Sequence, residues 1–246
     1  MLRRTTISIT LALYLSATVG CSTDPEARKQ RLLAAGNKYF EQGKYTEASI
    51  IYRRAIQQDR RFGEAYYRLG LTYLKLGQPQ QAAGAFRRAI ELQPGNADAY
   101  GQLIDLYLAA YLANPEEQKP LLTELQTYVA QLEQHVPGSV AAHRARGFVA
   151  LAQKDYQTAI AELKVAVERE PDDVKAQVGL AEALAASGQW AEAESRARQF
   201  IQQHPDQAPM YDFLYLQYVL RQQYDQAEAI LQQKCANNPK ELAYRM

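Results

Sequence analysis

The stretch Gly63–Asn96, GEAYYRLGLTYLKLGQPQQAAGAFRRAIELQPGN, decides the fold of this chain of 246 residues. Large, small and helix-stopping residues follow one another along it in a set order: Tyr66, Leu69, Gly70, Tyr73, Ala82, Phe86, Ala89 and Pro94. Glycine inside a helix costs about 1 kcal/mol relative to alanine, so Gly70 indicates a place where two helices approach closely. Pro94 is expected to end the second helix, because proline cannot continue a helix interior.

The same order of residues recurs with a period of 34. Gly36, Tyr39, Gly43, Ala48, Tyr52 and Ala55 lie 34 residues before Gly70, Tyr73, Gly77, Ala82, Phe86 and Ala89. Further along the chain, four prolines are spaced by the same 34 residues: Pro137, Pro171, Pro205 and Pro239. Pro94 precedes Pro137 by 43 residues, which is one period plus an insertion of nine. Self-similarity at a fixed period indicates a repeat architecture, here from about Lys29 onward.

These residues resemble the tetratricopeptide repeat, a helix–turn–helix unit of 34 residues. The resemblance implies an all-α, right-handed α-solenoid of about six units, in which neighbouring units bury each other's apolar faces. The solenoid is expected over 29–246, with units that start near Lys29, Gly63, Ala97, Val140, Val174 and Ala208. Residues 242–246 are similar to the start of a cap or of a seventh unit.

Small residues and prolines are expected to set how the helices pack. Three glycines each have an alanine twelve residues on, which predicts that the paired helices touch nearly backbone to backbone. The pairs are Gly36 with Ala48, Gly70 with Ala82 and Gly147 with Ala159. The second helices should stop at the prolines, because proline lacks the backbone N–H that a helix interior requires. These prolines are Pro94, Pro137, Pro171, Pro205 and Pro239.

The nine-residue insertion lies in the third unit. Its residues Asn114–Glu117 are typical of a helix start. Pro120 would break a helix already running, so the main helix should begin there. A longer loop and a displaced helix are therefore expected. One interpretation is a tolerated loop insertion; the other is a bend or a contact with a partner.

The first 28 residues have the pattern of an exported protein. Arg3 and Arg4 precede an apolar run at 7–19, and Gly20 and Cys21 follow. This order predicts a secretory signal peptide over 1–20. Residues 18–21, Thr-Val-Gly-Cys, resemble a bacterial lipobox, which implies that Cys21 receives a lipid and that 21–28 form a short tether. We then expect an anchor in the outer membrane, facing the periplasm; the alternative is ordinary cleavage to a soluble exported protein.

Composition and motifs argue against several classes of function. Lys and Arg number 28 against 27 Asp and Glu, and this balance argues against a nucleic-acid binder, which usually has a basic surplus. Two cysteines and three histidines are few for a metal centre. No HExxH, GxSxG, GxGxxG or Walker A pattern occurs. We therefore predict a protein that is not an enzyme and that needs neither a metal nor another cofactor.

The resemblance implies a concave groove lined by the first helix of each unit. The candidate groove residues are Asn37, Phe40, Tyr67, Arg68, Leu71, Lys75, Asp105, Arg144, Phe148, Glu182 and Phe213. A groove that is apolar in its middle suits an extended segment or an amphipathic helix with hydrophobic anchors. The alternative for the leucines is inter-helix core, which is the commoner outcome at helical spacing.

The expected function is a non-catalytic protein–protein scaffold or adaptor in the bacterial envelope. Its size, anchor and six units resemble the pilotin lipoproteins of type IV pili, and its start resembles lipoproteins of exopolysaccharide export. The expected partner is another envelope protein of a secretion, pilus or export machine, and a homodimer through the C-terminal end is a further expectation. Two alternatives are the interaction part of a longer enzyme, such as a glycosyltransferase, and a soluble periplasmic chaperone-like binder.

Overall fold

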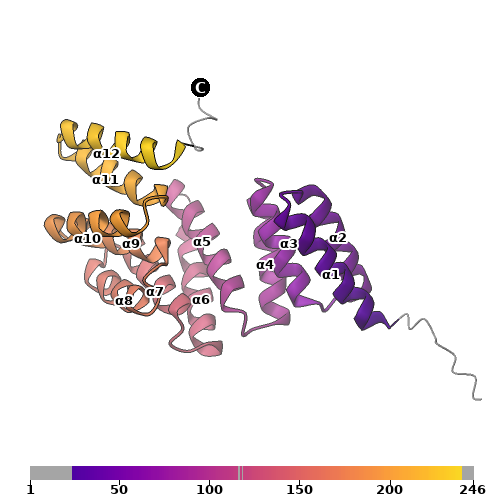
Figure 1. Cartoon of the computed structure of the whole chain (residues 1–246). Coiled ribbons are helices and arrows are strands. Elements are labelled where there is room, and N and C mark those ends of the chain that lie inside the picture. The colour runs from indigo at the N-terminus through magenta and orange to yellow at the C-terminus, as the bar shows by residue number, and fades with distance from the viewer. Residues whose placement is uncertain (1–23, 116, 118, 240–246) are drawn as a thin grey trace, which may run out of the picture.

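A computed structural model describes residues 24–115, 117 and 119–239 of the chain, so Cys21, the signal peptide and 242–246 lie outside the described residues. The described residues form twelve α-helices and no strand, which confirms the all-α solenoid (Figure 1). The helices are α1 (Pro25–Glu41), α2 (Tyr45–Gln58), α3 (Gly63–Lys75), α4 (Pro79–Leu92), α5 (Ala97–Ala113), α6 (Lys119–His135), α7 (Val140–Ala152), α8 (Tyr156–Arg169), α9 (Val174–Ala186), α10 (Trp190–Gln203), α11 (Ala208–Leu220) and α12 (Tyr224–Asn237).

Each repeat unit is a pair of consecutive helices, and local signals set where these begin and end. α1 begins at Pro25 because Asp24 caps it, with the Asp24 carboxylate accepting a hydrogen bond of 3.0 Å from the Glu26 backbone N–H. Five second helices end two residues before a proline, as expected from the missing N–H. These prolines are Pro94, Pro137, Pro171, Pro205 and Pro239.

A large side chain of the second helix lies against the glycine of the first helix in three units. A Cβ added at Gly70 would lie 2.5 Å from Cε1 of Phe86, a residue that is wholly buried. The equivalent pairs are Gly36 with Tyr52 and Gly147 with Leu163. The nearest side chain to each glycine is thus the one sixteen residues on, which the sequence did not indicate. The alanines twelve residues after these glycines, Ala48, Ala82 and Ala159, are themselves fully buried.

The insertion in the third unit lengthens helices. α5 and α6 each have 17 residues, whereas α3 has 13 and α4 has 14. Seven of the nine extra residues therefore lie in the two helices, and the other two lengthen the connection between α5 and α6, so the expected longer loop is present but short. α6 begins at Lys119, beside Pro120 as predicted. Asn114 caps the end of α5 rather than starting a helix, because the apolar pattern of α5 runs on through Leu112.

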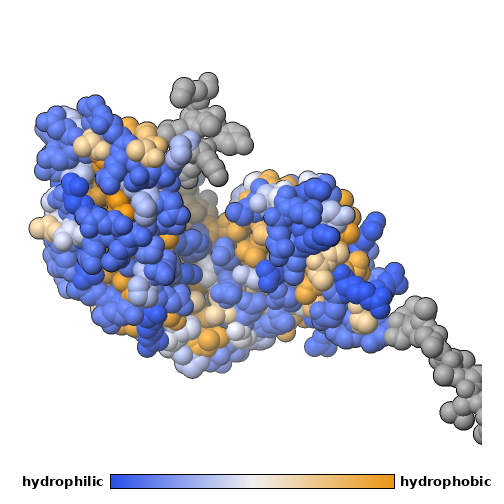
Figure 2. Space-filling model, viewed as in Figure 1, coloured by the Kyte–Doolittle hydropathy of each residue, from blue (hydrophilic) through white to orange (hydrophobic). Residues whose placement is uncertain are grey.

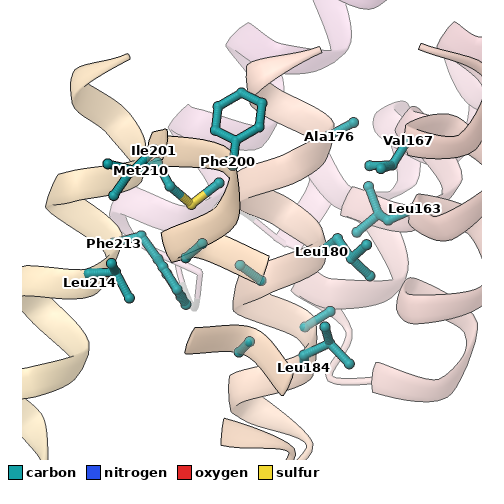
Figure 3. Close-up of a cluster of buried hydrophobic side chains, with 14 of the residues drawn as sticks. Leu163, Val167, Ala176, Leu180, Leu184, Phe200, Ile201, Met210, Phe213 and Leu214 are labelled. Carbon is teal, nitrogen blue, oxygen red and sulfur yellow. The ribbon is translucent and has the colours of Figure 1, made fainter. Parts of the chain in front are cut away.

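The array turns along its length, so that α9–α12 cross the direction of α1–α4 (Figure 1). Its surface is largely hydrophilic in the view of Figure 2, with apolar side chains exposed in patches. A large buried cluster joins the last three units, and Figure 3 shows its side chains reaching between successive helices. In the figure these include Leu163, Val167, Leu180, Leu184, Phe200, Ile201, Met210, Phe213 and Leu214. Among the described helices, none is long and apolar enough to cross a bilayer.

Candidate binding pocket on the inner face

The first helices α5, α7, α9 and α11 together line a pocket, called here the inner-face pocket. Its volume is about 820 Å³ and its lining is mostly apolar. Figure 2 shows the surface hollowed between the α1–α4 block and the later units. The lining residues are Leu108, Tyr111, Leu112, Asn114, Pro115, Phe148, Leu151, Ala152, Lys154, Tyr156, Glu182, Ala186 and Gln217.

The extra turn of α5 forms one wall of the pocket. Tyr111 and Leu112 lie beyond the thirteenth residue of α5, where the first helices of units two, four, five and six end, and Asn114 and Pro115 follow them. Leu112 is 55% exposed, so this wall presents an apolar side chain to solvent. Sequence reasoning did not include these residues in the groove. The signal that could have found them is the apolar pattern of α5, which continues past the usual length.

The floor of the pocket is held in place by close packing between α7 and α9. A Cβ added at Gly179 would lie 2.5 Å from Cε1 of Phe148, so the ring rests directly on the α9 backbone. Leu151 stands on α7 one turn after Phe148 and packs against the core of the last three units. The structure therefore brings two residues of the predicted groove, Phe148 and Glu182, into one apolar pocket.

Two other charged residues of the predicted groove are already paired. Asp105 of α5 accepts from the Lys175 ammonium of α9, across 70 positions in the sequence. The Arg144 guanidinium of α7 lies 2.5 Å from the Asp173 carboxylate, which also caps the start of α9. The first pair joins α5 to α9 past the intervening α7, and the second joins α7 to the start of α9. Sequence reasoning missed Lys175 and Asp173 as partners, because such pairs depend on how the units stack.

Glu182 differs from these residues because no cation among the described residues pairs with it. Glu182 is exposed to solvent, but it lies in the lining of the pocket, and the neighbouring lining residues take part of the water from around its carboxylate. This desolvation raises the pKa of the Glu182 carboxyl above its ordinary value. The pocket therefore presents one carboxylate within an otherwise mostly apolar lining, and Lys154 is its one cationic lining residue.

Predicted groove residues of the first two units do not line this pocket. Asn37 accepts a hydrogen bond of 2.7 Å from the Tyr52 hydroxyl, and Phe40 packs edge-on against Tyr45 at 5.3 Å. Arg68 donates to Glu64 at 2.7 Å. Tyr67 and Leu71 pack against the core that extends through α4 and α5, and Lys75 is exposed.

Phe213 corrects the predicted groove at its C-terminal end. It is 5% exposed and packs against Trp190, with 6.4 Å between the ring centroids. It therefore belongs to the core between α10 and α11 rather than to the groove. Gln217, one turn later on α11, lines the pocket instead.

Models of known repeat families match most of the repeat region of this chain. Sequence models described as tetratricopeptide repeat match residues 63–96, 125–174 and 150–214, and a model described as TPR repeat matches residues 36–77. The cell division cycle protein 27 homolog of Caenorhabditis elegans is 34% identical over 108 residues. The match covers 44% of this chain and 13% of that protein, so this chain spans only a small part of the relative's length.

Solved structures share the fold. The structure of PilW, described as a widely conserved type IV pilus biogenesis factor, is similar with a TM-score of 0.65 and 18% identity, covering 87% of this chain and 94% of that one. The structure of pilF from Pseudomonas aeruginosa is similar with a TM-score of 0.61 and 16% identity, covering 90% and 96%. At these identities the likeness shows the fold alone.

Proposed function

We propose that this chain, an array of tetratricopeptide repeats, is a non-catalytic adaptor that holds a segment of another protein in the inner-face pocket. The observation that carries the proposal is the pocket itself. Its volume of about 820 Å³ lies within the range of roughly 300–1,000 Å³ that is usual for ligand sites. Its apolar lining suits the hydrophobic anchors of an extended segment or an amphipathic helix.

The chemistry of the pocket favours binding over turnover. Its titratable lining consists of Glu182, Lys154 and two tyrosines, which stand among leucine, alanine and phenylalanine side chains. Within the described part of the chain, no group of three or more His, Cys, Asp and Glu side chains could hold a metal ion. Tetratricopeptide arrays generally act as scaffolds for protein–protein interaction, and this array offers its partner a preformed apolar surface.

We further propose that the adaptor is anchored in the bacterial envelope through a lipid on Cys21 and assists assembly of a secretion, pilus or exopolysaccharide-export machine. The order of residues in 1–21 supports the anchor. The likeness in fold to PilW, whose described role is in type IV pilus biogenesis, supports the class of machine. Because α1 begins at Pro25, an anchored array would lie close to the membrane surface.

In-cell photocrosslinking tests the adaptor. A photoreactive residue replaces Leu112 at the pocket wall, and one discrete envelope protein is expected as the adduct. Ala186→Asp, which puts a charge in the pocket at an exposed helix end, should abolish that adduct. The control is the same photoreactive residue at Glu168, which is exposed on α8. Absence of an adduct at Leu112, or the same adduct from Glu168, would contradict the adaptor.

A mass measurement tests the anchor separately. The intact mass of the protein extracted from membranes should correspond to a chain that begins at a lipid-modified Cys21. Cys21→Ala should move the protein to the soluble fraction. An unmodified Cys21, or a mature chain that begins elsewhere, would overturn the anchor and leave the pocket proposal in place.

A further inference from the structure

Glu182 belongs to a row of residues along the inner face. The row consists of the ninth residue of each unit from the third to the sixth: Asp105, Phe148, Glu182 and Leu216. Glu182 therefore stands between an aromatic and an aliphatic side chain on the neighbouring first helices. Leu216 is 54% exposed, so the apolar surface continues beyond Glu182 toward α11.

Two of the charges around this row are paired, whereas Glu182 and Lys154 form no ion pair in the described structure. Asp105 is neutralised by Lys175, and Arg144 is neutralised by Asp173. Lys154 also lines the pocket, but its ammonium forms no ion pair with Glu182 in the described structure. A carboxylate that has lost part of its hydration without gaining a cation is unfavourable. A cation brought by a ligand would recover this lost interaction, whereas an anionic ligand would be repelled.

Resting on the proposed adaptor function, we infer that the inner-face pocket selects a partner segment in which an arginine or lysine is flanked by large apolar side chains, with the cation paired to Glu182. The apolar side chains lie against Leu112 and Leu151, which line the same pocket. Arginine is favoured over lysine, because its planar guanidinium can bond the carboxylate through two N–H groups and stack on an aromatic face such as Phe148.

Peptide selection tests this specificity. The probe is a phage-displayed library of random 12-residue peptides, selected in parallel on the wild type and on Glu182→Gln. Peptides selected by the wild type should be enriched in arginine next to leucine, phenylalanine or tryptophan. Peptides selected by Glu182→Gln should keep the apolar residues and lose the cation. Glu168→Gln, which changes an exposed glutamate on α8, is the matched control and should select like the wild type.

Titration calorimetry then measures the coupling between the two charges. The most enriched arginine peptide and its Arg→Gln version are titrated into the wild type and into Glu182→Gln. Either change alone should weaken binding about tenfold. Both changes together should weaken it by no more than about the same factor, because each removes the same interaction. An equal loss on Arg→Gln with and without Glu182 would overturn the pairing.

The variant Glu182→Gln is expected to fold normally. The raised pKa of the Glu182 carboxyl means that its ionised form is disfavoured in the folded chain relative to the unfolded chain. Above the unfolded pKa this lowers stability, so a neutral glutamine should leave the melting temperature at pH 7 unchanged or raise it. A clear drop in melting temperature would show that Glu182 supports the fold, and it would overturn the inference.

Further outcomes separate this inference from the adaptor proposal. Leu112→Asp, at an exposed position of the pocket wall, should abolish peptide binding altogether. If peptides bind through Leu112 without a preferred cation, the adaptor stands and the inference falls. If every peptide that the wild type selects is also selected by Leu112→Asp, both the adaptor proposal and this inference are overturned. If sedimentation shows a dimer that Leu112→Asp dissociates, a second copy of this chain occupies the pocket and the inference is overturned.

Discussion

Gly70 shows how a single residue sets the distance between two helices. The Phe86 ring lies over the backbone of α3 at Gly70, where no Cβ is present. The ring is wholly buried, so it cannot move away from an added methyl group. In an isolated helix the same glycine would be a cost of about 1 kcal/mol. Its value in this fold therefore comes from packing and not from helix propensity.

Gly70→Ala is expected to destabilise the protein, because its Cβ would meet Phe86 at 2.5 Å. Overpacking of this kind costs about 1–3 kcal/mol, which exceeds the gain in helix propensity. Gly84→Ala in α4 is the control, since a Cβ there meets nothing within 4 Å, and it should stabilise by about 0.5–1 kcal/mol. Urea unfolding measures both. Stabilisation by Gly70→Ala would contradict this account.

At the scale of elements, a charged cluster joins α6, α7 and α8. The Arg146 guanidinium on α7 lies 2.6 Å from the Glu133 carboxylate of α6 and 2.9 Å from the Glu162 carboxylate of α8. His143 lies 2.7 Å from Glu162 through Nδ1. Burial raises the pKa of the Glu162 carboxyl, but the hydrogen bonds from Arg146 and His143 lower it by more. The net result is a pKa below the ordinary value.

Glu162→Gln is expected to lower stability by about 1 kcal/mol at pH 7. The folded pKa of Glu162 is below the unfolded value of 4.5, so the stabilisation is present above pH 4.5 and is lost as pH falls through the folded pKa. The difference in unfolding free energy from the wild type should therefore shrink below pH 4.5. Urea unfolding at pH 7 and pH 3.5 measures it, with Glu168→Gln on the same helix as the control. A difference that does not change with pH would refute the assignment.

At the scale of the whole molecule, stability is divided among neighbouring units. The first two units share small buried clusters around Tyr52 and Phe62, whereas one cluster runs through units two to four and another through the last three. No cluster spans the array from end to end among the described residues. Arrays of this kind approximate a chain of nearest-neighbour interactions, in which one end can lose structure before the other.

Tyr52→Ala should separate the two ends of the array. The side chain is wholly buried and its hydroxyl donates to Asn37, so its removal should cost about 3–5 kcal/mol locally. Trp190 is the single tryptophan of the chain, and it packs against Phe213 and Tyr218 far from Tyr52 in sequence. Thermal unfolding followed by circular dichroism should begin earlier in the variant, while the fluorescence transition of Trp190 shifts less. Identical shifts by both probes would show an all-or-none fold.

The 34-residue period allowed the sequence by itself to determine the all-α solenoid, the turns between units and the helix ends at the prolines. These features depend on interactions within one or two adjacent units, where glycine, alanine and proline act through local sterics. The glycines also indicated close approach of the paired helices, but not the large side chain that lies against each glycine, because the repeat pattern does not show which side chain of the second helix points at it.

Only the tertiary structure decided which residues line the inner-face pocket. Phe213 lies in the core, and Gln217 lines the pocket instead. Leu112 forms part of the pocket wall because α5 is about one turn longer than α7, α9 and α11. The ion pair between Asp105 and Lys175 likewise joins residues 70 positions apart. Such long-range contacts depend on the curvature of the array, and this curvature is the sum of the packing angles of all the helix pairs. No single repeat encodes that curvature, so the repeat pattern determines the units and their stacking determines the site.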